Sequence, residues 1–173
     1  KERLTRQRFW NYGNIRGATV DDLAFLEALI DTLSARYSIN LRRIYCVGMS
    51  NGSYMSYYLG CHSNRFAAIG GVTGSMSADL YASCRPARPL PVIQISGTKD
   101  PLNPYKGNAG SRAIEEVVKF WVKQNGCDTI PEITFLDNRN KRDQCTAERF
   151  LYTGGINGNT VALFKVIGGG HAW

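Results

Sequence analysis

The stretch IYCVGMSNGSYMSYYLG, residues 44–60, passes from an apolar run through two glycines into a helical pattern. Its centre, residues 48–52, matches G-x-S-x-G, a pattern that places a serine in a sharp turn from a strand into a helix. Side chains two residues before and after that serine would collide, and glycine relieves the crowding. The stretch therefore predicts a strand, a turn and a helix, with the Ser50 hydroxyl above the carboxyl edge of a sheet. A Gly-, Ser- and Asn-rich turn without any chemistry is the alternative.

Strand-like and helix-like segments alternate along the rest of the chain. Short apolar runs predict strands buried on both faces, and amphipathic patterns predict helices. We expect strands at 42–48, 66–74, 90–98 and 132–137, helices at 20–37, 50–61 and 111–126, and a hairpin formed by 148–153 and 160–167. This alternation indicates a single α/β domain of 1–173 with a mostly parallel sheet flanked by helices.

The first predicted helix, residues 20–37, has one apolar face formed by Leu26, Leu29, Ile30, Leu33 and Tyr37. Thr19, followed three residues later by Asp22, resembles a capping pair at the start of this helix.

Length, charge and hydropathy narrow the classes of partner. The 173 residues suffice for one domain with a sizeable core. The net charge is +7, but the basic residues are scattered apart from 1–8 and 138–143, and neither stretch interleaves aromatic residues. We therefore expect solvated surface rather than a nucleic-acid platform. No apolar run reaches the roughly 18 residues of a membrane span, so we do not expect a membrane as a partner. Nucleic acid is not expected as a partner either, because the basic residues are scattered.

The chain has five cysteines, which are many for a protein of a reduced compartment. None of them forms a C-x-x-C pair, so we expect neither a metal nor another cofactor. Cys46 lies in an apolar run, where a buried thiol is the simplest interpretation. The other four lie in loop-like sequence, which favours two disulfides and a secreted protein. Nearness along the sequence suggests the pairs Cys61–Cys84 and Cys127–Cys145, although four cysteines allow three pairings.

A nucleophilic serine requires a base, and the chain has two histidines. His62 comes about three helical turns after Ser50, so we interpret it as a surface or capping residue. His171 follows an apolar strand and three glycines, in a loop that leaves the carboxyl edge on which the predicted serine turn lies. His171 is therefore the candidate base.

The third member of a triad is an acid at another strand end, between the serine and the histidine in chain order. Asp100 directly follows a predicted strand and is the first candidate, although a turn or capping aspartate has the same position. Asp137, which closes the predicted strand at 132–137, is the stronger alternative, and Asp79 and Asp128 are further candidates.

The motifs GMSNG, GTKDPLNPY and GGGHAW, together with residues 21–60 and 66–74, resemble the polyhydroxybutyrate depolymerase and feruloyl esterase family of α/β-hydrolases. The resemblance covers roughly residues 10–173. It implies an α/β-hydrolase fold in which Ser50 is the nucleophile, His171 the base and Asp100 the acid. Family members carry several strands before the helix at 20–37, so the resemblance also implies a domain lacking its N-terminal strands.

By this likeness the chain is a secreted serine carboxylesterase, acting without a cofactor through an acyl-enzyme whose oxyanion the Asn51 N–H would hold. Its partners would be polyhydroxyalkanoates or feruloyl and acetyl esters of polysaccharides. Aromatic residues that we expect to be exposed, such as Trp10, Tyr12, Tyr105 and Trp173, are candidates for substrate contact, with Trp173 and Tyr105 the first choices, or else core or rim packing residues. A serine peptidase on the same fold and a catalytically inactive binding domain are the alternatives.

Overall fold

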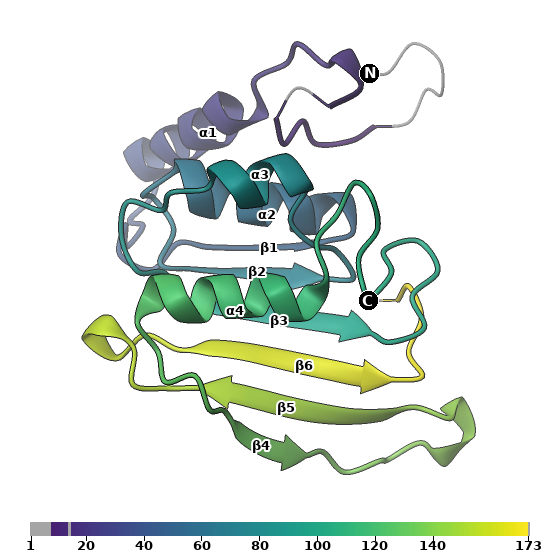
Figure 1. The fold of residues 1–173 in the computed structure, drawn as a ribbon. Helices are drawn as coiled ribbons and strands as arrows, with labels where there is room; N and C mark the ends of the chain where they lie inside the picture. The colour runs from purple at the N-terminus through teal and green to yellow at the C-terminus, as the bar shows by residue number, and fades with distance from the viewer. Residues whose placement is uncertain (1–7, 14, 173) are drawn as a thin grey trace.

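In residues 8–13 and 15–172, which the computed structural model describes, six strands form one mixed sheet in the order β1-β2-β3-β6-β5-β4 (Figure 1). The strands are β1 Tyr45–Met49, β2 Ala68–Val72, β3 Val92–Gly97, β4 Glu132–Phe135, β5 Thr146–Tyr152 and β6 Val161–Ile167. Neighbours among β1, β2, β3 and β6 pair in parallel, whereas β5 is antiparallel to both β6 and β4. The predicted α/β-hydrolase architecture, a mostly parallel sheet with flanking helices, is confirmed.

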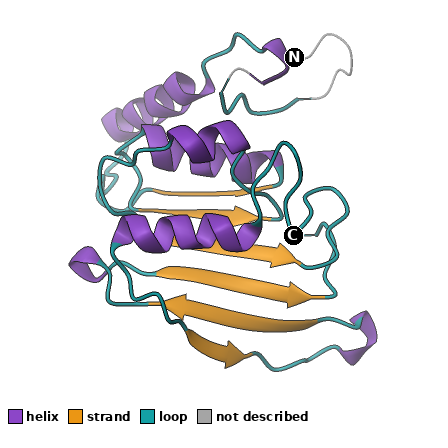
Figure 2. Ribbon diagram, in the orientation of Figure 1, coloured by secondary structure: helices purple, strands orange, loops and turns teal. Residues whose placement is uncertain are grey.

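Among the described residues, four α-helices connect or flank these strands (Figure 2). They are α1 Asp22–Arg36, α2 Asn51–His62, α3 Ala78–Ser83 and α4 Ile114–Asn125, with short 3₁₀ turns η1 Ile15–Gly17, η2 Lys141–Asp143 and η3 Ile156–Gly158. Helix α4 ends where predicted, at Gly126 in the left-handed conformation (φ 65°). Helix α3 was not predicted, because its six residues are too few to display a helical period.

Helices α2 and α4 meet over one face of the sheet. The rings of Tyr57 on α2 and Trp121 on α4 are stacked with centroids 6.2 Å apart, and both side chains are fully buried. Gly60 lets α2 lie close to the sheet, because a Cβ there would lie 2.7 Å from Cδ1 of Ile69 on β2. The core of the domain therefore lies between this helix pair and the sheet.

The opposite face carries exposed apolar side chains, which corrects the prediction of strands buried on both faces. Tyr45 and Val47 on β1 are 57% and 58% exposed, and Ile93 on β3 is 37% exposed. A Cβ at Gly70 would approach both Val47 and Ile93, so these residues share one face. Since β1 lies at the edge of the sheet, the predicted strand that precedes Ser50 is only partly covered in the described structure.

Helix α1 forms where predicted, but Asp21 caps it rather than Thr19. The Asp21 carboxylate accepts a hydrogen bond from the Ala24 N–H, 2.9 Å away. Of its apolar face, Leu26 and Ile30 are half-buried, whereas Leu29 and Leu33 remain 40% and 37% exposed. No helix in the described part of the chain has the length and apolar character to span a membrane.

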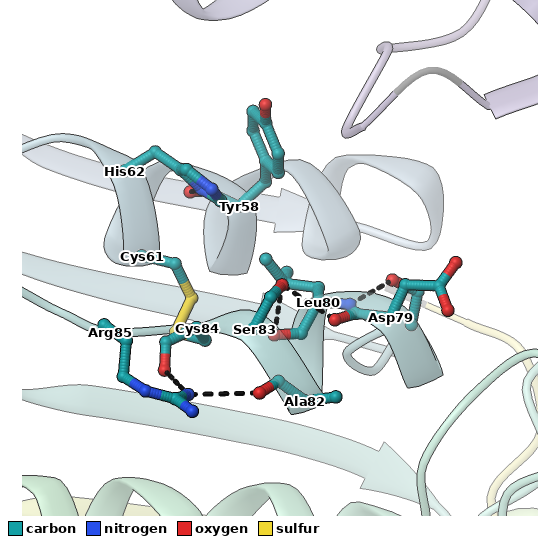
Figure 3. Close-up of a disulfide and its surroundings, with 10 residues drawn as sticks. Tyr58, Cys61, His62, Asp79, Leu80, Ala82, Ser83, Cys84 and Arg85 are labelled. Carbon is teal, nitrogen blue, oxygen red and sulfur yellow. Dashed lines mark hydrogen bonds between the residues drawn. A yellow bond between two sulfur atoms is a disulfide. The ribbon is translucent and has the colours of Figure 1, made fainter.

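One disulfide joins Cys61, near the end of α2, to Cys84, which directly follows α3 (Figure 3). The bond links residues 23 positions apart and fixes the short helix α3 against α2. His62 lies beside this bond on the surface, where its ring stacks on Tyr58 and its Nδ1 lies 2.9 Å from the Tyr58 carbonyl. His62 is thus a surface residue, as predicted.

The predicted second disulfide, Cys127–Cys145, is absent, and both cysteines are free. Cys145 directly precedes β5, whereas Cys127 lies beside the other end of that strand, where the Asp128 N–H bonds the Thr153 carbonyl. A strand of this length spans about 23 Å, far more than the roughly 7 Å between Cα atoms that a disulfide tolerates. The Cys127 thiol instead lies near the Asn159 carbonyl, and Cys46 is also free, as predicted.

Candidate active site

Ser50 occupies the predicted turn between β1 and α2, with φ 54° and ψ −117°. A residue with a Cβ at positive φ is strained, and such strain is found mainly where the surrounding structure enforces it. The Ser50 N–H donates to the Val72 carbonyl at 2.8 Å, which holds the turn against the end of β2. Ser50 therefore stands at the sharp strand-to-helix turn that the sequence pattern predicts.

The two glycines of the pattern have different surroundings. A Cβ at Gly48 would lie 2.2 Å from the Gly52 carbonyl oxygen, so no side chain fits there. A Cβ at Gly52 would meet nothing within 4 Å. Only Gly48 relieves the predicted crowding, because the crowding is between position 48 and the backbone at position 52.

The side chains of Asp100 and His171 meet after two different strands. Nδ1 of His171 lies 2.9 Å from Oδ2 and 3.1 Å from Oδ1 of Asp100. The Asp100 side chain is 1% exposed and that of His171 14%. Oδ1 of Asp100 also accepts hydrogen bonds from the backbone N–H groups of Leu102 and Asn103, each at 2.9 Å. When a carboxylate accepts a hydrogen bond from Nδ1–H of an imidazole, Nε2 carries no proton and is free to accept one.

Ser50, Asp100 and His171 follow the carboxyl ends of β1, β3 and β6, which run parallel. The carboxyl ends of parallel strands meet at one edge of a sheet, so the three residues share that edge. Asp100 and His171 are in contact there. In the described part of the chain no hydrogen bond joins His171 to Ser50, so the structure brings together the acid and the base but not yet the base and the serine.

The other candidate acids lie elsewhere. Asp137 is exposed beyond β4, the far edge strand, and Asp79 is exposed in the first turn of α3. Asp128 lies beside Gly154, just after the carboxyl end of β5, since a Cβ at Gly154 would lie 2.5 Å from the Asp128 carboxylate. Because β5 is antiparallel to β6, this end of β5 lies at the other edge of the sheet from His171. Of the four aspartates, Asp100 alone contacts His171.

In the part of the chain that the structure describes, Ser50 lines two cavities. The larger, of about 620 Å³, is lined by Arg8, Phe9, Trp10 and Asp22 together with residues 48–52. The smaller, of about 300 Å³, includes Tyr12, Tyr54 and Asn103 in its lining. Among the described residues, no group of three or more His, Cys, Asp or Glu side chains could hold a metal ion.

The segment before α1 forms a wall of both cavities and is anchored to the serine turn. The Trp10 N–H donates to Oδ1 of Asn51 at 2.6 Å, and Nδ2 of Asn51 donates back to the Trp10 carbonyl at 3.1 Å. The Asn11 N–H bonds the Asp22 carboxylate at 2.7 Å. The Tyr12 ring stacks on Tyr54 with centroids 4.9 Å apart. The side chain of Asn51 therefore holds this wall, a role that sequence reasoning missed.

The predicted oxyanion donor, the N–H of Asn51, belongs to the first residue of α2. Such N–H groups precede the intrahelical ladder and lie at the positive end of the helix dipole. The backbone geometry is therefore compatible with an anion beside Ser50.

Asn103 is a second residue that sequence reasoning missed. Its Nδ2 donates to the Thr73 carbonyl at 2.8 Å, and its Oδ1 accepts from the Tyr54 hydroxyl at 2.9 Å. Burial raises the pKa of the Tyr54 hydroxyl, and the negative charge of Asp100 adds to this rise, so the hydroxyl stays protonated and able to donate. No local pattern identifies Asn103, because its partners lie 30 and 49 residues earlier in the chain.

Of the aromatic candidates for substrate contact, Tyr105 lines neither of these cavities. Tyr105 is 4% exposed, and its hydroxyl donates to Glu115 at 3.3 Å, so the expectation of an exposed aromatic is wrong. A tyrosine in the core still packs well, since its one polar atom has a partner. Trp173 lies outside the described residues. Trp10, by contrast, lines the larger cavity and is 37% exposed.

Comparison with known proteins gives distant relatives, and no family model matches the chain. Feruloyl esterase B of Piromyces equi is 28% identical over 94% of this chain and 31% of its own length. The putative esterase NocK of Nocardia uniformis subsp. tsuyamanensis is 26% identical over 88% of this chain and 48% of its own. The chain thus spans under half the length of these relatives.

Among solved structures, the chain resembles esterase PE8 with a TM-score of 0.55, at 20% identity over 87% of this chain and 52% of that one. This likeness shows the α/β-hydrolase fold. Both sequence relatives are themselves named as esterases.

Proposed function

We propose that the chain is a carboxylic ester hydrolase in which Ser50, His171 and Asp100 act as a catalytic triad. The observation that carries the proposal is the buried contact between Asp100 and His171, on the sheet edge where Ser50 stands in a strained turn. Strain and a buried His–Asp pair are both costly and both cluster at catalytic sites. The similarity to proteins named feruloyl esterase and esterase favours esters over other acyl compounds.

In the proposed reaction, Nε2 of His171 accepts the Ser50 proton as Oγ attacks the ester carbonyl. Asp100 holds Nδ1–H and stabilises the imidazolium ion that forms. The Asn51 N–H donates to the oxyanion of the tetrahedral intermediate. His171 then returns the proton to the leaving alcohol, and water, deprotonated by the same imidazole, releases the acid from Ser50.

The proposed reaction requires a hydrogen bond between Ser50 and His171, which is not formed in the described structure without substrate. Catalytic hydrogen bonds are often long in the absence of substrate and form in the Michaelis complex. Gly169 and Gly170 directly precede His171, so small backbone changes can bring the imidazole toward Ser50.

For the natural substrate we propose an ester attached to a plant polysaccharide, such as a feruloyl or acetyl ester, encountered outside the cell. The disulfide between Cys61 and Cys84 favours an oxidising compartment. A polyhydroxyalkanoate, which the family resemblance also implies, is the second candidate. The open cavity that Phe9 and Trp10 line suits an aromatic acyl group better than a saturated aliphatic chain.

The test compares short p-nitrophenyl esters with matched peptide p-nitroanilides, in the parent chain and in Ser50→Ala. The proposal predicts ester hydrolysis that Ser50→Ala abolishes, with little cleavage of the anilides. Faster cleavage of the anilides would favour a peptidase, and hydrolysis of neither would favour a binding domain. Methyl ferulate and acetylated xylan, compared with a polyhydroxybutyrate film, separate the candidate substrates.

A further inference from the structure

The two cavities that contain Ser50 share an exposed arginine, Arg8. Within the described structure, the Arg8 side chain takes part in no ion pair or hydrogen bond. Asp22 lines the larger cavity with it, but the two form no ion pair, and Oδ2 of Asp22 already accepts from the Asn11 N–H. A guanidinium without a partner can pair with a bound anion.

The segment that directly follows Arg8 is anchored beside the serine turn. Trp10, two residues later, is held by both polar atoms of the Asn51 side chain. Asn11 is 8% exposed, and its Nδ2 donates to the Val20 carbonyl at 2.7 Å. Because Asn51 directly follows Ser50, these bonds hold the segment that follows Arg8 beside the nucleophile.

The charges around the cavities indicate where an anion would bind. Asp22 would repel an anion from its side of the larger cavity. In the smaller cavity Arg8 is the one charged residue among the described lining residues, and the others are the aromatic, amide and hydroxyl groups named above together with Ile15. An anion would therefore be more stable in the smaller cavity, which Arg8 and Ser50 both line. The net charge of +7 adds a general attraction for anions.

We propose that Arg8 determines specificity by pairing with a carboxylate on the substrate, so that the site prefers esters with a negative charge near the scissile bond. This inference rests on the proposed ester hydrolysis. The substrate class that it names is a carboxylate-bearing ester, for example one whose alcohol or acyl part is a benzoate or a uronic acid.

The test uses two substrates of the same shape, 4-acetoxybenzoate and 4-acetoxybenzamide, which carry a carboxylate and a neutral amide at the same position. The measured quantity is the ratio of their kcat/KM values. Comparing this ratio between variants cancels the different reactivities of the two phenol leaving groups. The variants are Arg8→Gln, Arg8→Lys and, as a control, Arg36→Gln.

Arg36 is a suitable control because it ends α1, whereas Asp22, at the start of α1, lines the larger cavity. A 15-residue helix places its two ends about 21 Å apart. We expect Arg8→Gln to lower the ratio about fivefold, a change typical of a partly exposed ion pair, mainly through KM. Arg8→Lys should retain part of the preference, and Arg36→Gln should leave the ratio unchanged.

Salt provides an independent readout. Between 0.1 M and 1 M salt the screening length falls from about 10 Å to about 3 Å, so the ratio of the parent chain should fall toward that of Arg8→Gln. An unchanged ratio in Arg8→Gln at low salt would overturn the inference, even if hydrolysis still required Ser50. Hydrolysis that survives in Ser50→Ala would instead overturn the proposed function.

A binding measurement keeps the inference testable without turnover. In the Ser50→Ala background, calorimetric titration with 4-acetoxybenzoate and with 4-acetoxybenzamide gives two dissociation constants. We expect the benzoate to bind about fivefold more tightly, and Arg8→Gln to remove that difference. Equal affinities before the Arg8 substitution would contradict the role of Arg8, whether or not the chain hydrolyses esters.

Discussion

The hydroxyl of Tyr54, on helix α2, donates a 2.9 Å hydrogen bond to Oδ1 of Asn103, in the turn that begins at Asp100. Nδ2 of Asn103 also bonds the Thr73 carbonyl, which follows β2. The backbone N–H of the same asparagine donates to the Asp100 carboxylate. One side chain therefore ties the acid-bearing turn to the helix that starts beside Ser50, so Asn103 is a positioning residue for the candidate triad.

Tyr54→Phe and Asn103→Ala should each lower kcat about tenfold, because each frees the Asp100 turn from α2. Since they remove the same hydrogen bond, the double variant should lose little more than the worse single variant, with a coupling energy of about 1 kcal/mol. Ester hydrolysis of the four proteins measures this cycle. Tyr37→Phe and Asn64→Ala, at exposed positions, are controls. Strictly additive losses would contradict the shared role.

Gly48→Ala and Gly52→Ala form a matched pair in the serine turn. A Cβ at Gly48 would lie 2.2 Å from the Gly52 carbonyl oxygen, so Gly48→Ala must shift the turn and should lower the melting temperature and abolish hydrolysis. A Cβ at Gly52 meets nothing, and alanine favours the helix by up to about 1 kcal/mol. Thermal unfolding of both variants checks this difference. Equal destabilisation would show that the turn geometry is wrong.

Asp100→Asn should lower kcat by up to about ten-thousandfold with little change in KM, because an amide favours the wrong imidazole tautomer. The buried carboxylate accepts two backbone N–H bonds besides the imidazole contact, so the variant also needs a stability measurement. Asp137→Asn, at an exposed position beyond β4, should retain activity. A severe loss at Asp137 with a mild one at Asp100 would move the acid to the later strand.

Alkaline pH should destabilise the fold through its buried tyrosines. Burial raises the pKa of Tyr57 and of Tyr105, and for Tyr105 the negative charge of Glu115 adds to the rise. Because the folded-state pKa is raised, stability is fully present below the unfolded pKa of about 10 and is lost as the pH rises above it. Each such group should contribute a slope of about 1.4 kcal/mol per pH unit.

Tyr57→Phe isolates one of these contributions. The Tyr57 hydroxyl donates to Oε1 of Gln94, so the variant should be about 1–3 kcal/mol less stable at neutral pH. Above pH 10 its stability should fall less steeply than that of the parent chain. Denaturant unfolding from pH 8 to 12 measures both effects, with Tyr37→Phe, 64% exposed, as the control. Parallel pH profiles would contradict the role of Tyr57.

The local elements could be predicted from the sequence because their signals are local. Gly126 marks the end of α4, and the spacing of Gly48 and Ser50 marks the turn after β1. Chain order and strand ends were also enough to pair Asp100 with His171, since parallel strands bring distant loops to one edge. These inferences needed no knowledge of side-chain packing.

What the sequence could not predict depends on contacts between distant segments. The anchoring of Trp10 by Asn51 joins residues 41 positions apart, and neither belongs to a motif that implies the other. The wrong pairing of Cys127 with Cys145 arose because nearness in sequence does not reveal that β5 separates them. Tyr105 was expected at the surface because burial of an amphipathic ring depends on a partner, here Glu115, that no local pattern reveals.

The central claim is that Ser50 forms the acyl-enzyme with the help of His171. Brief reaction with p-nitrophenyl acetate, an acid quench and peptide mass mapping measure it directly. The account predicts one acetyl group on the peptide that contains Ser50, none after Ser50→Ala, and a strongly reduced amount after His171→Ala. Turnover with no acetyl group on that peptide, or acetylation that His171→Ala leaves unchanged, would contradict it.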